Sequence, residues 1–107
     1  MSRSAEQRVA DILEAIERCQ RYLGFLDGDD PSLVNMAEDA IERNLQIIGE
    51  AANHLPAEFT STRPEIAWPQ IRGFRNILVH QYFGVELDTV RDVIQAHLPA
   101  LAAVLRD

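Results

Sequence analysis

The side chains best suited to chemistry in this 107-residue chain gather within residues 72–82. This stretch holds two arginines, Arg72 and Arg75, the amide of Asn76, the imidazole of His80 and the phenol of Tyr82. A histidine titrates near neutral pH, and an arginine presents a fixed charge that suits phosphate oxygens. These groups could cleave an RNA phosphodiester without a metal. His80 would move the proton of a 2′-hydroxyl or of the leaving oxygen, and Arg75 would hold and neutralise the phosphate.

The arrangement of these residues on a helix decides how they can act together. The segment that opens at Trp68 is expected to be helical until shortly after Tyr82. On an ideal helix Arg75 stacks with Tyr82 and Asn76 stacks with His80, with an apolar stripe between the two polar faces. Arg75 and His80 are then about 140° apart, which is too wide for one chain to place both on one phosphate. Two chains about a two-fold axis would solve this, so the geometry predicts a site at a dimer seam.

A structural interpretation of the same residues stays open. Arg75 can pair with a nearby carboxylate, His80 can be an ordinary helix residue, and Tyr82 can pack with its hydroxyl at the surface. Elsewhere, Glu50 and His54 lie one helical turn apart, but the Glu-x-x-His spacing of di-iron bundles is absent. We therefore predict no metal site and assign this pair a structural or surface role.

Composition bounds the class of protein. The length and the 47% of hydrophobic residues indicate one domain, residues 1–107, with a single core. Cys19 is the only cysteine, which excludes an intrachain disulfide and favours a reducing, cytoplasmic setting. The chain opens without an apolar leader and has no run of about 18 apolar residues, so a soluble protein without membrane association is expected.

The charge distribution points to one segment. The net charge of −7 argues against broad attraction to nucleic acid. Between residues 61 and 80, however, Arg63, Arg72 and Arg75 face a single acidic residue, Glu65. All ten basic residues are arginines, which suits bidentate phosphate contacts but equally fits the codon bias of a GC-rich genome. Any anion site is expected in this segment, with Arg72 as a further phosphate or RNA contact.

Four amphipathic helices must position these residues. Apolar residues at helical spacing predict helices over about residues 4–25, 31–55, 68–82 and 87–105, with a short extra turn near 57–60. Ser4 with Gln7 resembles a capping box, Asp30 suits an N-cap, and Pro99 is expected to kink or restart the last helix. Gly49 costs the second helix up to about 1 kcal/mol relative to alanine, so we expect close packing there. The fold class predicted is all-α, an antiparallel four-helix bundle.

The signature itself is familiar. Arg75-Asn76-x-x-x-His80-x-Tyr82 resembles the Arg-x4-His-x-Tyr signature of the HepT-like branch of the HEPN-domain ribonuclease toxins. Residues 40–52 and 68–88 also look like that family, so the likeness covers most of the chain. The resemblance implies a HEPN-like homodimer whose paired Arg75 and His80 motifs cleave RNA without metal or cofactor, with Asn76 helping to position the site.

The resemblance also implies a partner and a means of control. It implies a toxin–antitoxin system, in which a small MNT-type nucleotidyltransferase antitoxin transfers AMP from ATP to the signature tyrosine, matched here by Tyr82. The phosphate of an attached AMP would compete for the Arg75 guanidinium. The alternative is a non-catalytic helical module that binds a nucleotidyltransferase or a nucleotide, and the acidic balance of the chain favours it.

Overall fold

Helices make up all the regular structure in the part of the chain that is described. The computed structural model describes residues 3–77 and 85–107, without the side chains of 85–87. The elements in chain order are α1 (Ala5–Leu23), η1 (Gly24–Asp27), α2 (Pro31–Asn53), α3 (Ala57–Ser61), α4 (Trp68–Arg72), η2 (Gly73–Asn76), α5 (Val85–Asp92), η3 (Val93–His97) and α6 (Leu98–Arg106). Both η1 and η2 are 3-10 turns, and η3 is a π-helical turn. The predicted all-α fold is confirmed.

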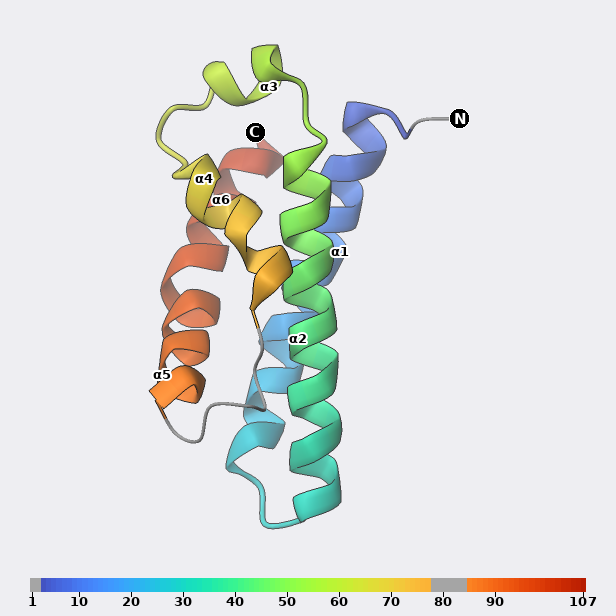
Figure 1. The fold of residues 1–107 in the computed structure, drawn as a ribbon, viewed down its shortest axis with the longest axis vertical. Helices are drawn as coiled ribbons and strands as arrows, with labels where there is room; N and C mark the ends of the chain where they lie inside the picture. The colour runs from blue at the N-terminus through green and yellow to red at the C-terminus, as the bar shows by residue number, and fades with distance from the viewer. Residues whose placement is uncertain (1–2, 78–84) are drawn as a thin grey trace.

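The helices form an antiparallel bundle around one core (Figure 1). A long hairpin of α1 and α2 is flanked by two further columns: η3 and α6 contact α1, whereas α4 and η2 contact α2. The core consists of apolar residues that are almost wholly buried, among them Ile12, Ile16, Ile41, Leu45, Ile48, Val90, Ile94, Leu98 and Leu101. Burial of these side chains supplies the main driving force for the bundle. None of the described helices has the length and apolar character needed to cross a lipid bilayer.

The helix starts follow the local signals in the sequence. Ser4 Oγ accepts a hydrogen bond from the Gln7 backbone N–H at 3.1 Å, and Gln7 Oε1 accepts one from the Ser4 backbone N–H at 2.8 Å. At the start of α2, the Asp30 carboxylate accepts the backbone N–H of Ser32 at 2.9 Å, and Pro31 is the first helical residue. Both caps satisfy N–H groups that a helix leaves unpaired, so the hairpin of α1 and α2 begins and turns where the sequence predicts.

The expected break at Pro99 is absorbed by a wider helical turn. Proline has no backbone N–H, and its ring clashes with the carbonyl four residues earlier in a regular α-helix. In η3 the backbone widens, and the Leu98 N–H donates to the Val93 carbonyl, five residues back. α6 then continues with Pro99 in its first turn. The two-part last helix is confirmed, and its break is a π turn.

Burial also decides the role of the one cysteine. Cys19 lies in the core of α1 and is 0% exposed. Burial raises the pKa of its thiol to about 12, because the apolar surroundings disfavour the charged thiolate. The thiol is therefore neutral near pH 7 and is a poor nucleophile.

The third helix is shorter than predicted. The periodicity extends over residues 68–82, but α4 gives way to the 3-10 turn η2 at Gly73, and η2 ends at Asn76. Ile77 has an extended backbone, with φ −73° and ψ 133°. Glycine weakens a helix from within, and Gly73 stands where the α-helix ends. The prediction of one unbroken helix over this segment is wrong.

The extended backbone at Ile77 also removes the geometric reason for a site made by two chains. The separation of about 140° between Arg75 and His80 assumes regular α-helix across Ile77. The extended backbone at Ile77 breaks that assumption, and with it the predicted stacking of Tyr82 over Arg75. His80 and Tyr82 themselves lie outside the described residues. The angle between Arg75 and His80 on an ideal helix therefore gives no evidence that two chains share the site.

Candidate active site

Trp68 fixes the beginning of the segment that carries the arginine motif. Its side chain is buried, and its indole Nε1 donates to the Arg63 carbonyl at 3.0 Å. The indole ring packs edge to face against the ring of Phe59, with the two centroids 6.5 Å apart. The guanidinium of Arg63 lies over the Phe59 ring, 3.7 Å from its centroid. Aromatic and cation–π contacts of this kind hold the connection between α3 and α4. The start of α4 is thereby anchored.

Gly49 fixes the other end of that segment. A β-carbon at Gly49 would lie 2.4 Å from the backbone nitrogen of Arg75 and 3.0 Å from the carbonyl oxygen of Arg72. Such distances leave no room for a side chain, so the backbone of η2 rests directly on α2. The close packing predicted at Gly49 is confirmed. Phe74 is buried in the core, and the next residue, Arg75, is directed outward and exposed.

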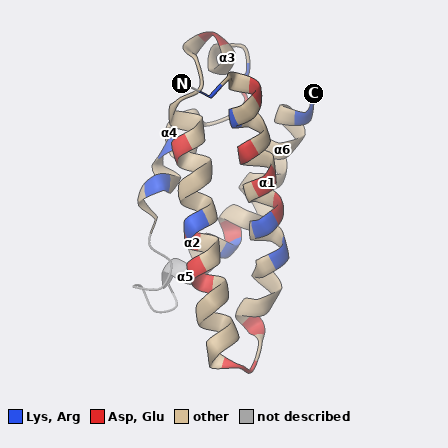
Figure 2. Cartoon of the chain, turned by 90° about the vertical axis from the view of Figure 1, so that its right-hand side faces the viewer, with Lys and Arg blue, Asp and Glu red and all other residues tan. Residues whose placement is uncertain are grey.

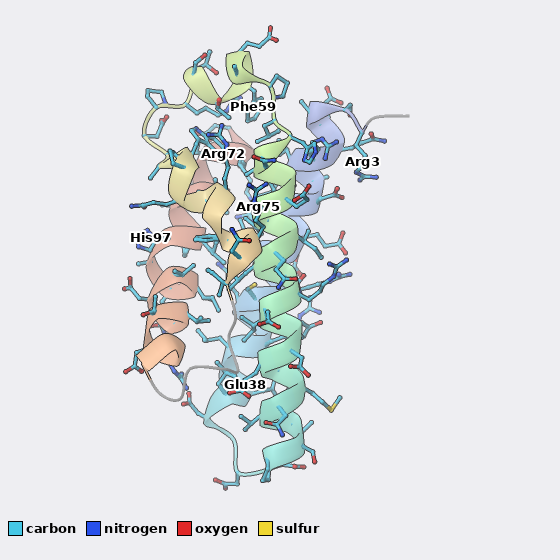
Figure 3. The ribbon with its side chains drawn as sticks, in the orientation of Figure 1. Arg3, Glu38, Phe59, Arg72, Arg75 and His97 are labelled. Atoms are coloured by element: carbon cyan, nitrogen blue, oxygen red, sulfur yellow. The ribbon has the colours of Figure 1, made fainter. Side chains whose placement is uncertain are left out.

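Arg75 lines an open hollow of about 410 Å³ between α1, α2 and η2, which we call the arginine hollow. Its basic lining residues are Arg3, Arg8, Arg43 and Arg75, and its acidic ones are Asp11 and Glu50. Figure 3 shows Arg75 on the η2 side of α2 and Arg3 near the start of α1. Three segments that are far apart in the sequence thus contribute guanidinium groups to one surface.

Each carboxylate of the hollow has a basic side chain beside it. Asp11 pairs with Arg3 at 2.8 Å. The Glu50 carboxylate lies 3.3 Å from Nδ1 of His54, which is charged only when protonated. Both acidic groups face partners other than Arg75. Glu50 and His54 thus form a contact between two exposed side chains, in keeping with the structural or surface role predicted for them.

The remaining arginines of the hollow carry uncompensated charge. Within residues 3–77 and 85–107, no ion pair involves Arg8, Arg43 or Arg75. Elsewhere on α1, Arg18 and Arg21 each pair with a glutamate one turn earlier. Figure 2 shows basic residues standing among acidic ones along the two long helices. The arginine hollow is therefore a local excess of positive charge in a chain of net charge −7, as an anion site requires.

The site residues predicted from sequence fall into three groups. Arg75 lines the arginine hollow, and within the described residues it has no carboxylate partner. Asn76 is exposed as the last residue of η2, and Arg72 is partly exposed but is not among the residues that line the hollow. The structure does not describe His80 or Tyr82. It therefore joins Arg75 to arginines outside the motif and leaves Arg72 apart from them.

Sequence reasoning missed the arginines of α1 and α2. Arg43, Gln46 and Glu50 recur at spacings of three and four residues and so share one face of α2. Gly49 stands beside that face and was expected to receive a close neighbour. The signal was present, but the sequence did not reveal which segment packs on Gly49, so the basic residues could not be assigned to one surface.

Comparison with known proteins decides the family. A family model described as "Ribonuclease HepT-like" matches residues 12–107. The chain belongs to the HepT-like ribonuclease family. The resemblance carried by the Arg-x4-His-x-Tyr signature is thereby confirmed.

Relatives of this HepT-like chain have names that refer to ribonucleases. It is 33% identical over 101 residues to "Probable ribonuclease HepT" of Thermococcus cleftensis, covering 94% of this chain and 92% of the relative. It is 30% identical over 91 residues to "Putative RNase MJ1380" of Methanocaldococcus jannaschii, covering 85% and 84%. A longer protein of the latter organism, "Gamma-glutamylcyclotransferase and putative RNase MJ0434", is 37% identical over 90 residues, or 84% of this chain and 40% of that one. The comparison with solved structures gave no match.

We expect Gly49→Ala to destabilise the protein by about 1–2 kcal/mol. The alanine gains up to about 1 kcal/mol of helix propensity. Overpacking costs about 1–3 kcal/mol, and an approach of 2.4 Å to the backbone nitrogen of Arg75 belongs at the upper end of that range or displaces η2. Gly24→Ala is the matched control, because a β-carbon at Gly24 meets nothing within 4 Å. Urea unfolding followed by circular dichroism measures both variants. A Gly49→Ala protein as stable as the unmodified one would show that this contact does not set the position of η2.

Proposed function

We propose that this HepT-like protein is an endoribonuclease that cleaves RNA without a metal, with Arg75 and His80 as its catalytic residues. The observation that carries the proposal is the state of Arg75. It is exposed, it has no ion pair among the described residues, and it lines a hollow with an excess of positive charge. A guanidinium in this state is available to phosphate oxygens. Membership of the HepT-like family supports RNA as the source of that phosphate.

The proposed reaction divides the work between a fixed charge and a titrating group. His80 accepts the proton of the 2′-hydroxyl or returns a proton to the leaving 5′-oxygen. The 2′-oxygen attacks phosphorus, the bond to the 5′-oxygen breaks, and the products are a 2′,3′-cyclic phosphate and a 5′-hydroxyl. Arg75 holds the phosphate and stabilises the charge that develops on its non-bridging oxygens. Asn76 helps to position these groups, and Arg72 contacts RNA outside the arginine hollow.

The active site is proposed to be shared by two copies of the chain. The arginine hollow is open on its outer side, and electrostatic stabilisation is stronger where water is excluded. A second copy about a two-fold axis would stand over its outer side, with the RNA strand between the two copies, and would bring a second motif beside the first. The family resemblance, which implies a homodimer, supports the same assembly.

Control of the site is proposed to act through Tyr82. The protein would be the toxin of a toxin–antitoxin pair, and a nucleotidyltransferase antitoxin would modify it. The phenol oxygen of Tyr82 attacks the α-phosphorus of ATP, pyrophosphate leaves, and AMP remains attached. The negative charge of the added phosphate then competes with RNA for the Arg75 guanidinium. These steps are supported by the signature residues alone.

We expect Arg75→Ala to lower kcat about 10²- to 10³-fold and His80→Ala to lower it about 10²- to 10⁴-fold. Purified protein is incubated with end-labelled RNA in the presence of EDTA, and the products are resolved on a gel. Arg106→Ala, which changes an exposed arginine outside the hollow, is the control for lost charge. RNA left intact by the unmodified protein would sink the proposal. Nucleic-acid or nucleotide binding without cleavage would favour the non-catalytic module.

The composite site predicts a second result. Inactive Arg75→Ala and His80→Ala subunits, unfolded together and refolded as a mixture, should regain roughly a quarter of the unmodified activity. Half of randomly mixed dimers contain one copy of each variant. A two-fold axis makes two sites, each with Arg75 from one chain and His80 from the other, so one of the two sites in a mixed dimer holds both intact groups. Size-exclusion chromatography with light scattering checks that dimers form. A mixture that remains inactive would place both groups of each site on one chain.

AMP transfer predicts a change of mass. Incubation with the nucleotidyltransferase and ATP should add AMP units to the protein and abolish cleavage, because the new phosphate occupies the guanidinium of Arg75. Intact-mass spectrometry measures the addition, and Tyr82→Phe is the control that cannot accept AMP. An unchanged mass, or equal modification of Tyr82→Phe, would contradict Tyr82 as the acceptor.

A further inference from the structure

Two arginines outside the motif share the surface of Arg75. Arg8 of α1 and Arg43 of α2 line the arginine hollow beside it, and neither has an ion pair in the described ranges. Arg43 is exposed and Arg8 is partly so, which leaves their charged ends accessible. Arg18 and Arg21, on the same helix as Arg8, are instead neutralised by neighbouring glutamates. Uncompensated charge is thus concentrated where Arg75 lies.

We infer that Arg8 and Arg43 bind phosphates of single-stranded RNA next to the phosphate that Arg75 holds. This inference rests on the proposed ribonuclease function and gives that site its RNA-binding surface. One phosphate needs one bidentate guanidinium, whereas the hollow offers three without partners among the described residues. Further phosphates along the same strand account for the other two.

The size of the arginine hollow favours a single strand. Its volume of about 410 Å³ lies within the range of pockets that enclose small ligands, so it holds about two nucleosides, which three consecutive phosphates join and flank. A duplex meets proteins across wide grooves and successive phosphates, which this hollow cannot enclose. A flexible strand can also bring adjacent phosphates onto α1, α2 and η2 in turn.

The acidic residues of the hollow tune this binding. Asp11 is held by Arg3 at 2.8 Å, so its charge is largely offset. Glu50 has His54 close by, at 3.3 Å, and this histidine offsets its charge only when protonated. The Glu50 carboxylate therefore repels phosphate from the same surface that Arg43 makes attractive.

An acidic protein could meet the same arginines, but the shape of the site favours RNA. A protein partner usually covers about 800 Å² of each surface, with an apolar centre. The arginine hollow is small, concave and charged, and it contains the arginine proposed to hold the reacting phosphate. Binding of the antitoxin to these arginines in place of RNA is one outcome that the experiment distinguishes.

The test uses a fluorescent single-stranded oligonucleotide with 2′-O-methyl ribose, which lacks the attacking hydroxyl and cannot be cleaved. Fluorescence anisotropy measures its affinity for the full-length protein over a range of KCl concentrations. Arg8→Ala and Arg43→Ala should each weaken binding, and each should lower the slope of log affinity against log salt by about 0.7. Glu50→Gln should strengthen binding. Arg18→Ala, an arginine paired outside the hollow, should leave affinity and slope unchanged.

Cleavage kinetics separate binding from chemistry. With cleavable RNA, Arg8→Ala and Arg43→Ala should raise KM and leave kcat nearly unchanged, whereas Arg75→Ala lowers kcat. Arg43→Lys should retain most of the salt slope, because a phosphate contact depends mainly on charge. Urea unfolding midpoints check that each variant is folded, so that a loss of binding is read only from folded protein.

The outcomes distinguish the inference from the function on which it rests. Equal affinity of the Arg8→Ala, Arg43→Ala and Arg18→Ala proteins for the oligonucleotide would overturn the inference even if RNA is cleaved. Loss of antitoxin binding in the first two variants, with oligonucleotide affinity unchanged, would overturn it in favour of a protein partner. Weakened binding in those two variants by a protein that never cleaves RNA would support the surface and overturn the ribonuclease proposal.

Discussion

The position of the whole candidate site depends on one contact between backbones, that of η2 with Gly49 of α2. A contact made by side chains can adjust through rotamers, but one made by main-chain atoms leaves no such freedom. The 2.4 Å that would separate a β-carbon at Gly49 from the Arg75 nitrogen measures how little space remains. Because Phe74 is buried in the core on one side of η2, Arg75 must leave on the other. With Trp68 anchored at the start of α4, the backbone of residues 68–76 is held at both ends. The long side chain of Arg75 therefore extends from a fixed backbone.

This placement explains how an acidic protein can present a phosphate site. Two arginines of α1, Arg18 and Arg21, are neutralised along the helix, and the net charge of −7 repels polyanions from the surface at large. At the arginine hollow, however, three elements meet and each contributes a guanidinium without a carboxylate partner among the described residues. Attraction is therefore confined to the hollow in which, on the proposed function, the strand is cut. A uniformly basic surface would bind RNA more tightly but would also hold it in unproductive positions.

The sequence predicted those features that depend on neighbouring residues. The capping box at Ser4, the start of α2 at Pro31 and the interruption before Pro99 are local, and all appear in the structure. The end of the third helix is different. Ile71 and Phe74 are three residues apart, and this spacing buries both side chains whether the segment stays α-helical or tightens into a 3-10 turn. The apolar pattern therefore does not distinguish the two. The turn is fitted to Gly49, more than twenty residues earlier in the chain. Likewise the motif identified Arg75, whereas Arg8 and Arg43 join it only through packing of three helices; His80 and Tyr82 remain predictions.

Clustering unpaired guanidinium groups has a consequence for stability as well as for binding. Like charges on one surface repel, so Arg8, Arg43 and Arg75 make the empty hollow less favourable than a neutral surface would be. A bound phosphate chain removes that repulsion, and binding to the folded state alone raises its stability by mass action. An AMP group on Tyr82 would bring one phosphate to the same charges permanently. The RNA strand and the attached AMP would then compete for the same relief of repulsion between the arginines. On this proposal, a single covalent phosphate near Arg75 is therefore enough to exclude a longer strand.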